Sequence, residues 1–141
     1  MTGVQTCALP IYKVKIPEEG YDLRPGEFIL ATTENMFNLP DGAGINIDGF
    51  GYSGEYKLKS SMARVGLEHL NAGWADAGWH DSQLTLELKN LTQYHHLKIR
   101  AGMKIGQIVM FRHEPIPADR SYAARGRYNS QKGATQGKGV E

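Results

Sequence analysis

Glu87 is an acidic residue in the strand that the sequence predicts most clearly. It lies in residues 83–89, where Leu84, Leu86 and Leu88 alternate with polar residues. Successive side chains of a β-strand point to opposite faces, so this pattern turns Glu87 away from the leucine-lined face. A carboxylate held there could take a proton from water and return it, as general acid–base catalysis requires. For a lone glutamate on such a face, a solvated surface residue is the better interpretation.

The last 22 residues, 120–141, differ in composition from the rest of the chain. They contain five basic residues, one acidic residue and four glycines. This composition indicates either a disordered basic tail or a flap that becomes ordered on an anionic ligand.

The sequence contains no pattern that predicts a zinc site. Cys7 is the single cysteine of the sequence, so neither a disulfide framework nor a cysteine-ligated zinc site can form. His95 and His96 are adjacent and would point to opposite faces of a strand, which argues against a shared metal. We therefore expect no metal site in the protein and no zinc.

Composition is that of an ordinary soluble domain. Hydrophobic residues make up 40% of the chain, charged residues 22%, and the formal net charge is +1. These values do not indicate a particular binding partner, and we expect neither nucleic acid nor membrane binding. Without a bilayer-length apolar run or a signal-peptide pattern, a cytoplasmic location is the default expectation.

The chain reads as short strands separated by turn residues, and this pattern predicts an all-β fold that must position these side chains. The chain of 141 residues is long enough for one domain. The expected strands cover residues 27–32, 52–59, 83–89, 97–99 and 105–111, and the apolar composition of the last of them suggests a covered position. The one expected helix is about two turns that begin at Ser60, with Ser60 as its N-cap.

Residues 1–11 resemble the conceptual translation of a sequencing adapter. We interpret them as an artefactual leader, which would leave Cys7 without functional meaning; a natural strand over residues 4–11 is the alternative. The expected organisation is this leader, an N-terminally truncated β domain over residues 12–119, and a basic, glycine-rich flap over residues 120–141.

Four segments, in order, resemble the dCTP deaminase family and its bifunctional dCTP deaminase/dUTPase branch. They are Leu39-Pro40 followed by residues 59–67 (Lys-Ser-Ser-Met-Ala-Arg-Val-Gly-Leu), residues 71–79 (Asn-Ala-Gly-Trp-Ala-Asp-Ala-Gly-Trp), residues 84–90 followed by 101–107, and Tyr122 with residues 127–133. The resemblance implies a dUTPase-like β-clip, or distorted jelly-roll barrel, that assembles as a homotrimer with active sites between subunits.

The same resemblance assigns catalytic roles. Glu87 would be the general acid/base, while Ser60 and Arg64 would hold the nucleophile and the substrate. Helix capping and a surface ion pair are the alternative roles of these two residues. Ala72 and Gly73 would offer main-chain contacts to the water and the base, because small residues let a backbone approach a ligand.

The remaining assignments concern sugar and phosphates. Asp76 would contact deoxyribose or orient the water, although a turn-stabilising role fits nearly as well, and Tyr122 would lie near the sugar. The phosphate contacts would be Ser61, Arg127 and Gln131, with Mg²⁺ arriving on the substrate triphosphate. Lys59 stands where the family has arginine, and it cannot form the bidentate contact of a guanidinium.

These assignments predict deamination of dCTP to dUTP and ammonia without zinc. A bifunctional enzyme that continues to dUMP and pyrophosphate is the close alternative, favoured by residues 72–74 and Asp76. An inactive, truncated nucleotide-binding trimer is the third possibility, because Lys59 departs from the family pattern and the N-terminal part of the domain is expected to be missing.

Overall fold

The computed structural model describes residues 12–138, which form short strands joined by turns. The predicted leader with Cys7 lies outside the described residues, as do residues 139–141 at the end of the predicted flap. The elements, in chain order, are β1 (Tyr21–Leu23), β2 (Phe28–Phe37), β3 (Gly51–Leu58), α1 (Ser60–Ala63), β4 (Leu67–Glu68), β5 (Trp74–Ala75), β6 (Ser82–Asn90), β7 (Leu97–Ile99), β8 (Gly106–His113) and α2 (Tyr122–Arg125).

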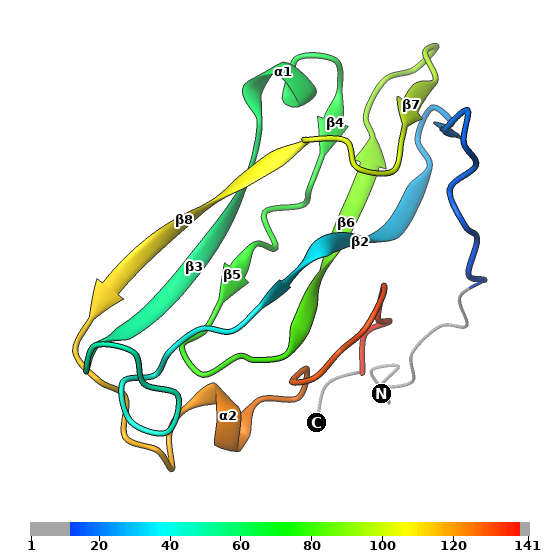
Figure 1. Cartoon of the computed structure of the whole chain (residues 1–141). Coiled ribbons are helices and arrows are strands. Elements are labelled where there is room, and N and C mark those ends of the chain that lie inside the picture. Colours follow the sequence, from blue (N-terminus) through cyan, green and yellow to red (C-terminus); the bar gives the residue numbers. More distant parts are fainter. Residues whose placement is uncertain (1–11, 139–141) are drawn as a thin grey trace, which may run out of the picture.

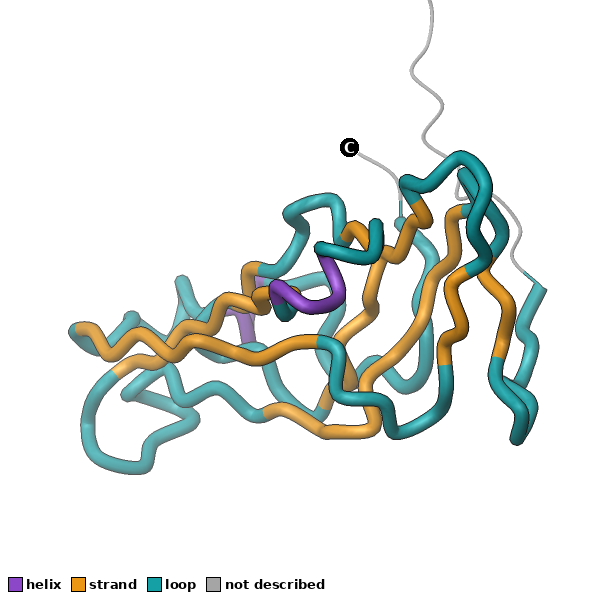
Figure 2. The backbone as a smooth tube through the Cα atoms, turned by 90° about the horizontal axis from the view of Figure 1, so that it is seen from above, coloured by secondary structure: helices purple, strands orange, loops and turns teal. Residues whose placement is uncertain are grey.

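The described strands form three small antiparallel sheets (Figure 1). β1 pairs with β7, β6 lies between β2 and β4, and β3 lies between β5 and β8. Seen from above, the β3–β8 ribbon extends away from the other strands (Figure 2). The predicted all-β class is confirmed, whereas the homotrimer stays a prediction. Within residues 12–138 no helix has the length and apolarity that a membrane crossing would need.

β6 organises the core, and its alternation is as the sequence predicts. Leu84, Leu86 and Leu88 are 8%, 5% and 0% exposed, while Gln83, Thr85 and Glu87 on the other face are partly exposed. The leucines pack in one cluster with residues from most of the other strands. Burial of apolar surface contributes a stabilising free energy of about 25 cal/mol per Å². Burial of this face therefore fixes the register of β6, and with it the side of the sheet to which Glu87 points.

The helix predicted at Ser60 is shorter than expected and is capped differently. α1 is a single turn, its N-cap is Lys59, and no side chain caps it. Ser60 is therefore the first helical residue, and its predicted capping role is wrong. Gly66 follows with φ +95°, a conformation that a helix cannot continue through, and this explains the early end.

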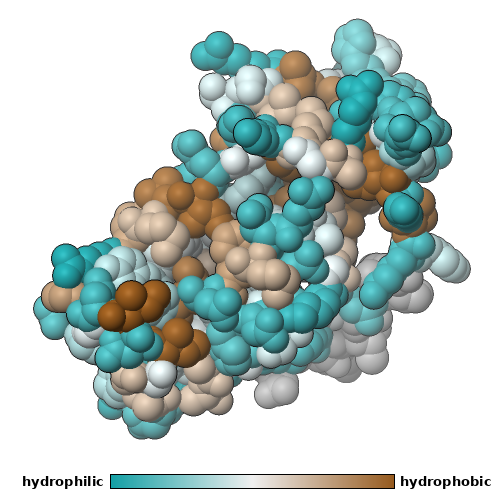
Figure 3. All heavy atoms as spheres, viewed as in Figure 1, coloured by the Kyte–Doolittle hydropathy of each residue, from teal (hydrophilic) through white to brown (hydrophobic). Residues whose placement is uncertain are grey.

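β8 is less covered than its composition suggests. It pairs only with β3, so it is an edge strand of the described sheet. Consecutive apolar residues in a strand must point to both faces, and Val109, Met110 and Phe111 are 39%, 48% and 42% exposed. Apolar side chains accordingly appear at the surface on the side that β8 crosses (Figure 3). The predicted covered position is wrong for the single chain.

A buried aspartate ties the loop after β2 to the start of the tail. Asp41 is 1% exposed and accepts hydrogen bonds at 2.9 Å from the backbone amides of Ala43 and Ile45. Burial alone would raise the pKa of this carboxyl, but hydrogen bonds from Ser121 and those amides lower it on balance. The bond to Ser121 holds the segment that leads into α2 against the sheets.

Candidate active site

Glu87 lies beside a histidine that the sequence analysis did not single out. Oε2 of Glu87 is 3.4 Å from Nε2 of His69, and the two side chains are 28% and 5% exposed. The contact is not aligned as a hydrogen bond, so neither atom has a hydrogen-bond partner among the described residues. Both atoms can therefore bond to a third group placed between or beside them.

Burial governs the protonation of both groups. It raises the pKa of Glu87, although a hydrogen bond from its own backbone amide opposes the shift. It lowers the pKa of His69, against the charge of Glu68. Both shifts favour the neutral forms, so the contact is not a strong ion pair at neutral pH. A carboxyl group with a raised pKa is well suited to accept a proton and then return it.

An unusual turn holds His69 in place. His69 N and Leu70 N both donate to Oε1 of Glu68, at 2.9 and 2.8 Å. Leu70 and Asn71 then have φ values of +56° and +55°, which cost energy in residues with a side chain. Such a backbone persists only where the surroundings enforce it.

Tyr56 and Gly73 provide those surroundings. The Tyr56 ring lies 4.6 Å from the His69 ring, and burial raises the pKa of Tyr56 to about 12. Tyr56 N donates to Gly73 O at 2.8 Å, and a Cβ on Gly73 would lie 2.4 Å from Tyr56 O. The glycine predicted to approach a ligand thus also approaches a neighbouring strand, which by itself requires a small residue.

The predicted residues around α1 lie apart from Glu87. Lys59, Ser60, Ser61 and Arg64 are all exposed. No hydrogen bond or ion pair in the described part of the chain joins any of these four to Glu87. α1 instead packs against β4. In a single chain these side chains and the carboxylate do not form one site.

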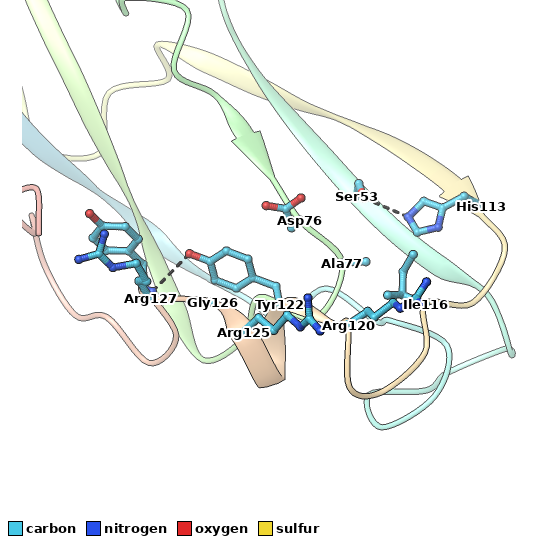
Figure 4. Close-up of a pocket in the computed structure, with 11 residues that line it drawn as sticks. Ser53, Asp76, Ala77, His113, Ile116, Arg120, Tyr122, Arg125, Gly126 and Arg127 are labelled. Atoms are coloured by element: carbon cyan, nitrogen blue, oxygen red, sulfur yellow. Dashed lines mark hydrogen bonds between the residues drawn. The ribbon is translucent and has the colours of Figure 1, made fainter. Parts of the chain in front are cut away.

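An open groove of about 660 Å³ gathers a second set of predicted residues (Figure 4). Asp76, Tyr122 and Arg127 line it, together with Ser53 and His113 from the sheet. Asp76 accepts a hydrogen bond from Trp74 Nε1 at 3.0 Å, and the Tyr122 hydroxyl accepts one from Tyr128 N at 3.3 Å. Glu87 is not part of its lining.

The tail beyond the groove lies along the outer face of β6. Gln131 exchanges backbone and side-chain hydrogen bonds with the backbone of Gln83, and Gly133 N donates to Gln83 Oε1 at 2.7 Å. Thr135 N then donates to Thr85 Oγ1 at 3.1 Å. The outward residues of β6 follow in the order 83, 85, 87, so the tail leads towards Glu87.

These contacts engage two predicted phosphate ligands. Gln131 Nε2 donates to Gln83 O at 2.6 Å, and Arg127 donates to Lys138 O at 3.0 Å. The structure thus separates the predicted residues into three groups: Glu87 with the loop at Ala72 and Gly73, the exposed residues around α1, and the groove with the tail.

Sequence reasoning missed His69, although a weak signal was present. Leu67 is buried, and the period of two from Leu67 places His69 on the same inward side. His69 is indeed 4% exposed. Ser53 and His113 gave no such signal, because their pairing depends on the register between β3 and β8.

Within residues 12–138, no three histidine, cysteine, aspartate or glutamate side chains gather as a metal site would require. The cations that the groove does contain are arginines, which are suited to an anionic ligand such as a phosphate.

Comparison with known proteins gives consistent matches. A family model for dCTP deaminase-like proteins matches residues 3–113. A protein named "dCTP deaminase, dUMP-forming" from Persephonella marina is 40% identical over 123 residues, which cover 87% of this chain and 61% of that protein. Proteins of the same name from Hydrogenobaculum sp. and Acidothermus cellulolyticus are 40% and 38% identical, over 86% and 84% of this chain and 60% and 58% of their own.

The chain thus spans about 60% of the length of the curated relatives it matches. The family model covers most of the β domain, including α1, the His69 turn and Glu87. The chain belongs to the dCTP deaminase-like family.

Proposed function

We propose that this chain forms the catalytic core of an enzyme that converts dCTP to dUMP, ammonia and pyrophosphate. The observation that carries the proposal is the partly buried Glu87 beside His69, with its raised carboxyl pKa. Relatives named as dUMP-forming favour this bifunctional reaction over one that stops at dUTP. Deamination with release of dUTP is the second candidate.

Glu87 is the general acid/base of the deamination. In its ionised form it takes a proton from water as the oxygen adds to C4 of cytosine. It returns this proton to the ring nitrogen N3, and it then moves the proton of the new C4 hydroxyl to the amino group, so that ammonia departs and a carbonyl forms at C4. His69 lies beside the carboxylate, and the main chain at Ala72 and Gly73 faces the base.

The remaining residues bind the rest of the nucleotide. Asp76 and Tyr122 contact the deoxyribose, while Ser61, Arg127 and Gln131 contact the phosphates. Ser60 and Arg64 come from a neighbouring subunit of a homotrimer, because in one chain α1 lies apart from Glu87. Mg²⁺, when bound, neutralises charge on the triphosphate; no protein metal site is proposed.

The test measures ammonia and pyrophosphate released from dCTP by the wild-type chain and by Glu87→Gln. We expect the wild type to release both in equal amounts, with dUMP as the nucleotide product. Glu87→Gln keeps the size and polarity of the side chain but cannot accept the proton. It should lose at least about 100-fold in ammonia release while still binding dCTP.

Glu18→Gln is the matched control, since Glu18 is an exposed glutamate that does not line the groove. It should behave as the wild type. Ammonia accompanied by dUTP alone would favour the second candidate, and pyrophosphate without ammonia would rule out deamination. Undiminished turnover by Glu87→Gln would remove Glu87 from the reaction.

A further inference from the structure

The groove has two walls of different chemistry (Figure 4). The sheet wall carries Asp76, Ser53 and His113, and the tail wall carries Arg120, Arg125 and Arg127. Three arginines and one aspartate thus line an open groove of about 660 Å³, which is within the usual size range of ligand sites. Arg120 and Arg125 were not singled out from the sequence.

The sheet wall presents hydrogen-bond acceptors. His113 Nδ1 lies 2.8 Å from Glu114 O, and a carbonyl can only accept, so Nδ1 carries the proton of the neutral ring. Nε2 then accepts from Ser53 Oγ at 3.0 Å, which leaves the serine oxygen as an acceptor. The carboxylate of Asp76, which lines the same groove, adds further acceptor positions. This wall is suited to hydroxyl groups.

Gly51 makes this arrangement possible. The His113 ring lies over Gly51, where a Cβ would be only 2.3 Å from His113 Cε1. Any other residue at position 51 would displace the imidazole from Ser53. The sheet wall is therefore a fixed surface and not a chance contact of mobile side chains.

The tail wall presents donors on a segment that is well anchored. Tyr122 N donates to Ala77 O at 3.1 Å, and Ser121 is 1% exposed. Packing is tight here, since a Cβ on Gly78 would lie 1.9 Å from Ser121 Oγ. The segment that carries Arg120 and Arg125 is thus held against the sheet by its backbone.

The two arginines keep donors available. Arg125 donates through Nε to Asp119 O at 2.8 Å, which engages one of its five N–H groups. The Arg120 side chain is exposed and has no hydrogen bond or ion pair with any other residue in the range 12–138. Arginine donors in this number favour phosphate oxygens, which accept bidentate bonds.

We propose that Arg120 and Arg125 bind the phosphates of a nucleotide whose sugar faces the acceptor wall at Asp76 and Ser53. The inference rests on the proposed function for the identity of the nucleotide. It adds two phosphate contacts to those expected from the family pattern. It also gives a role to the arginines that line the groove. Gln131, an expected phosphate ligand, is instead hydrogen-bonded to β6.

The experiment measures equilibrium binding to the full chain by calorimetry with three probes: dCTP, inorganic tripolyphosphate and deoxycytidine. Arg120→Ala and Arg125→Ala should each weaken dCTP and tripolyphosphate binding by about 10- to 100-fold, the effect of losing a charge-assisted contact. Deoxycytidine, which has no phosphate, should bind to both variants as it does to the wild type. Arg100→Ala is the matched control for the loss of one exposed positive charge and should change none of these affinities.

Wild-type affinity for dCTP and tripolyphosphate in both arginine variants would overturn the inference, as would an equal loss in Arg100→Ala or an absence of phosphate binding by the wild type. The proposed function fails separately. If Arg120→Ala loses tripolyphosphate binding but the wild type releases no ammonia, the phosphate site stands and the reaction does not. If the wild type deaminates dCTP and both arginine variants do so with unchanged KM, the reaction stands and the phosphate site does not.

Discussion

At the scale of single residues, the protonation of Glu87 is the decisive property. Its partial burial disfavours the charged form, and its polar neighbour His69 is itself held neutral by burial. The proposed general base must be ionised before it can accept a proton, so under this proposal a raised carboxyl pKa raises the pH below which activity is lost.

We therefore expect the acidic limb of the pH profile of kcat/KM for ammonia release to lie above the pKa of an ordinary glutamate. His69→Phe keeps an aromatic ring against Tyr56 but removes the polar atom that faces Glu87. The carboxylate then has a more apolar environment, so the acidic limb should move to still higher pH and kcat should fall by about tenfold or more. Steady-state assays across pH measure both effects.

Tyr56→Phe is the matched control, because the Tyr56 hydroxyl has no hydrogen-bond partner among residues 12–138. Its profile should coincide with that of the wild type. A wild-type acidic limb at the pKa of an ordinary glutamate would contradict the raised pKa of Glu87. An acidic limb that does not move in His69→Phe would show that His69 has a packing role only.

At the scale of elements, β6 serves the core and the site at once. Its leucines fill the core, and its outward residues Gln83, Thr85 and Glu87 contact in turn the tail and His69. The period of two is what makes this division possible. Docking of the tail and positioning of the carboxylate are therefore properties of one strand face.

Gln83→Ala tests this coupling. The change removes the acceptor of Gly133 N and the donor to Thr33 O, at 2.7 and 2.9 Å. Amide exchange in residues 131–135 should accelerate by about 3- to 10-fold, as the loss of ordinary hydrogen bonds predicts. Hydrogen–deuterium exchange with mass spectrometry measures this, and Gln93→Ala, at an exposed glutamine away from the tail, is the control. Unchanged exchange in Gln83→Ala would mean that other contacts hold the tail.

Sequence patterns predicted the strands well because hydrophobic alternation reports directly on burial. β6 and β7 lie within a residue of their expected bounds, and β3 and β8 within two, whereas β2 continues past a register shift to Phe37. Capping at Ser60 was wrong because cap geometry depends on the backbone of the preceding residue, which no pattern reveals. The His69–Glu87 and Ser53–His113 contacts also escaped prediction, since each joins strands whose register is set by the whole fold.

At the scale of the whole molecule, the separation of the predicted residues is the main result. Arg64 and its neighbours around α1 are exposed, and Glu87 lies beside His69 on β6 without a contact to them. Either the site does not need α1, or α1 of another copy approaches Glu87. The apolar residues exposed on β8 indicate that part of the surface of one chain is suited to a partner.

Mixing two inactive variants distinguishes these possibilities. If each site takes Arg64 from one subunit and Glu87 from the next, Arg64→Ala and Glu87→Gln are each inactive as homotrimers. Random 1:1 trimers of the two then contain intact sites wherever a Glu87→Gln subunit supplies Arg64 to an Arg64→Ala subunit, so ammonia release should recover to about one quarter of the wild-type rate. Chains unfolded together, refolded together and assayed with dCTP provide the measurement, and the same chains refolded separately before mixing provide the control. If the site does not need α1, Arg64→Ala should release ammonia on its own, before any mixing. If both variants are inactive and no mixture recovers ammonia release, Arg64 and Glu87 are not shared between neighbouring subunits, and that outcome would overturn the assignment of Arg64 to a neighbour.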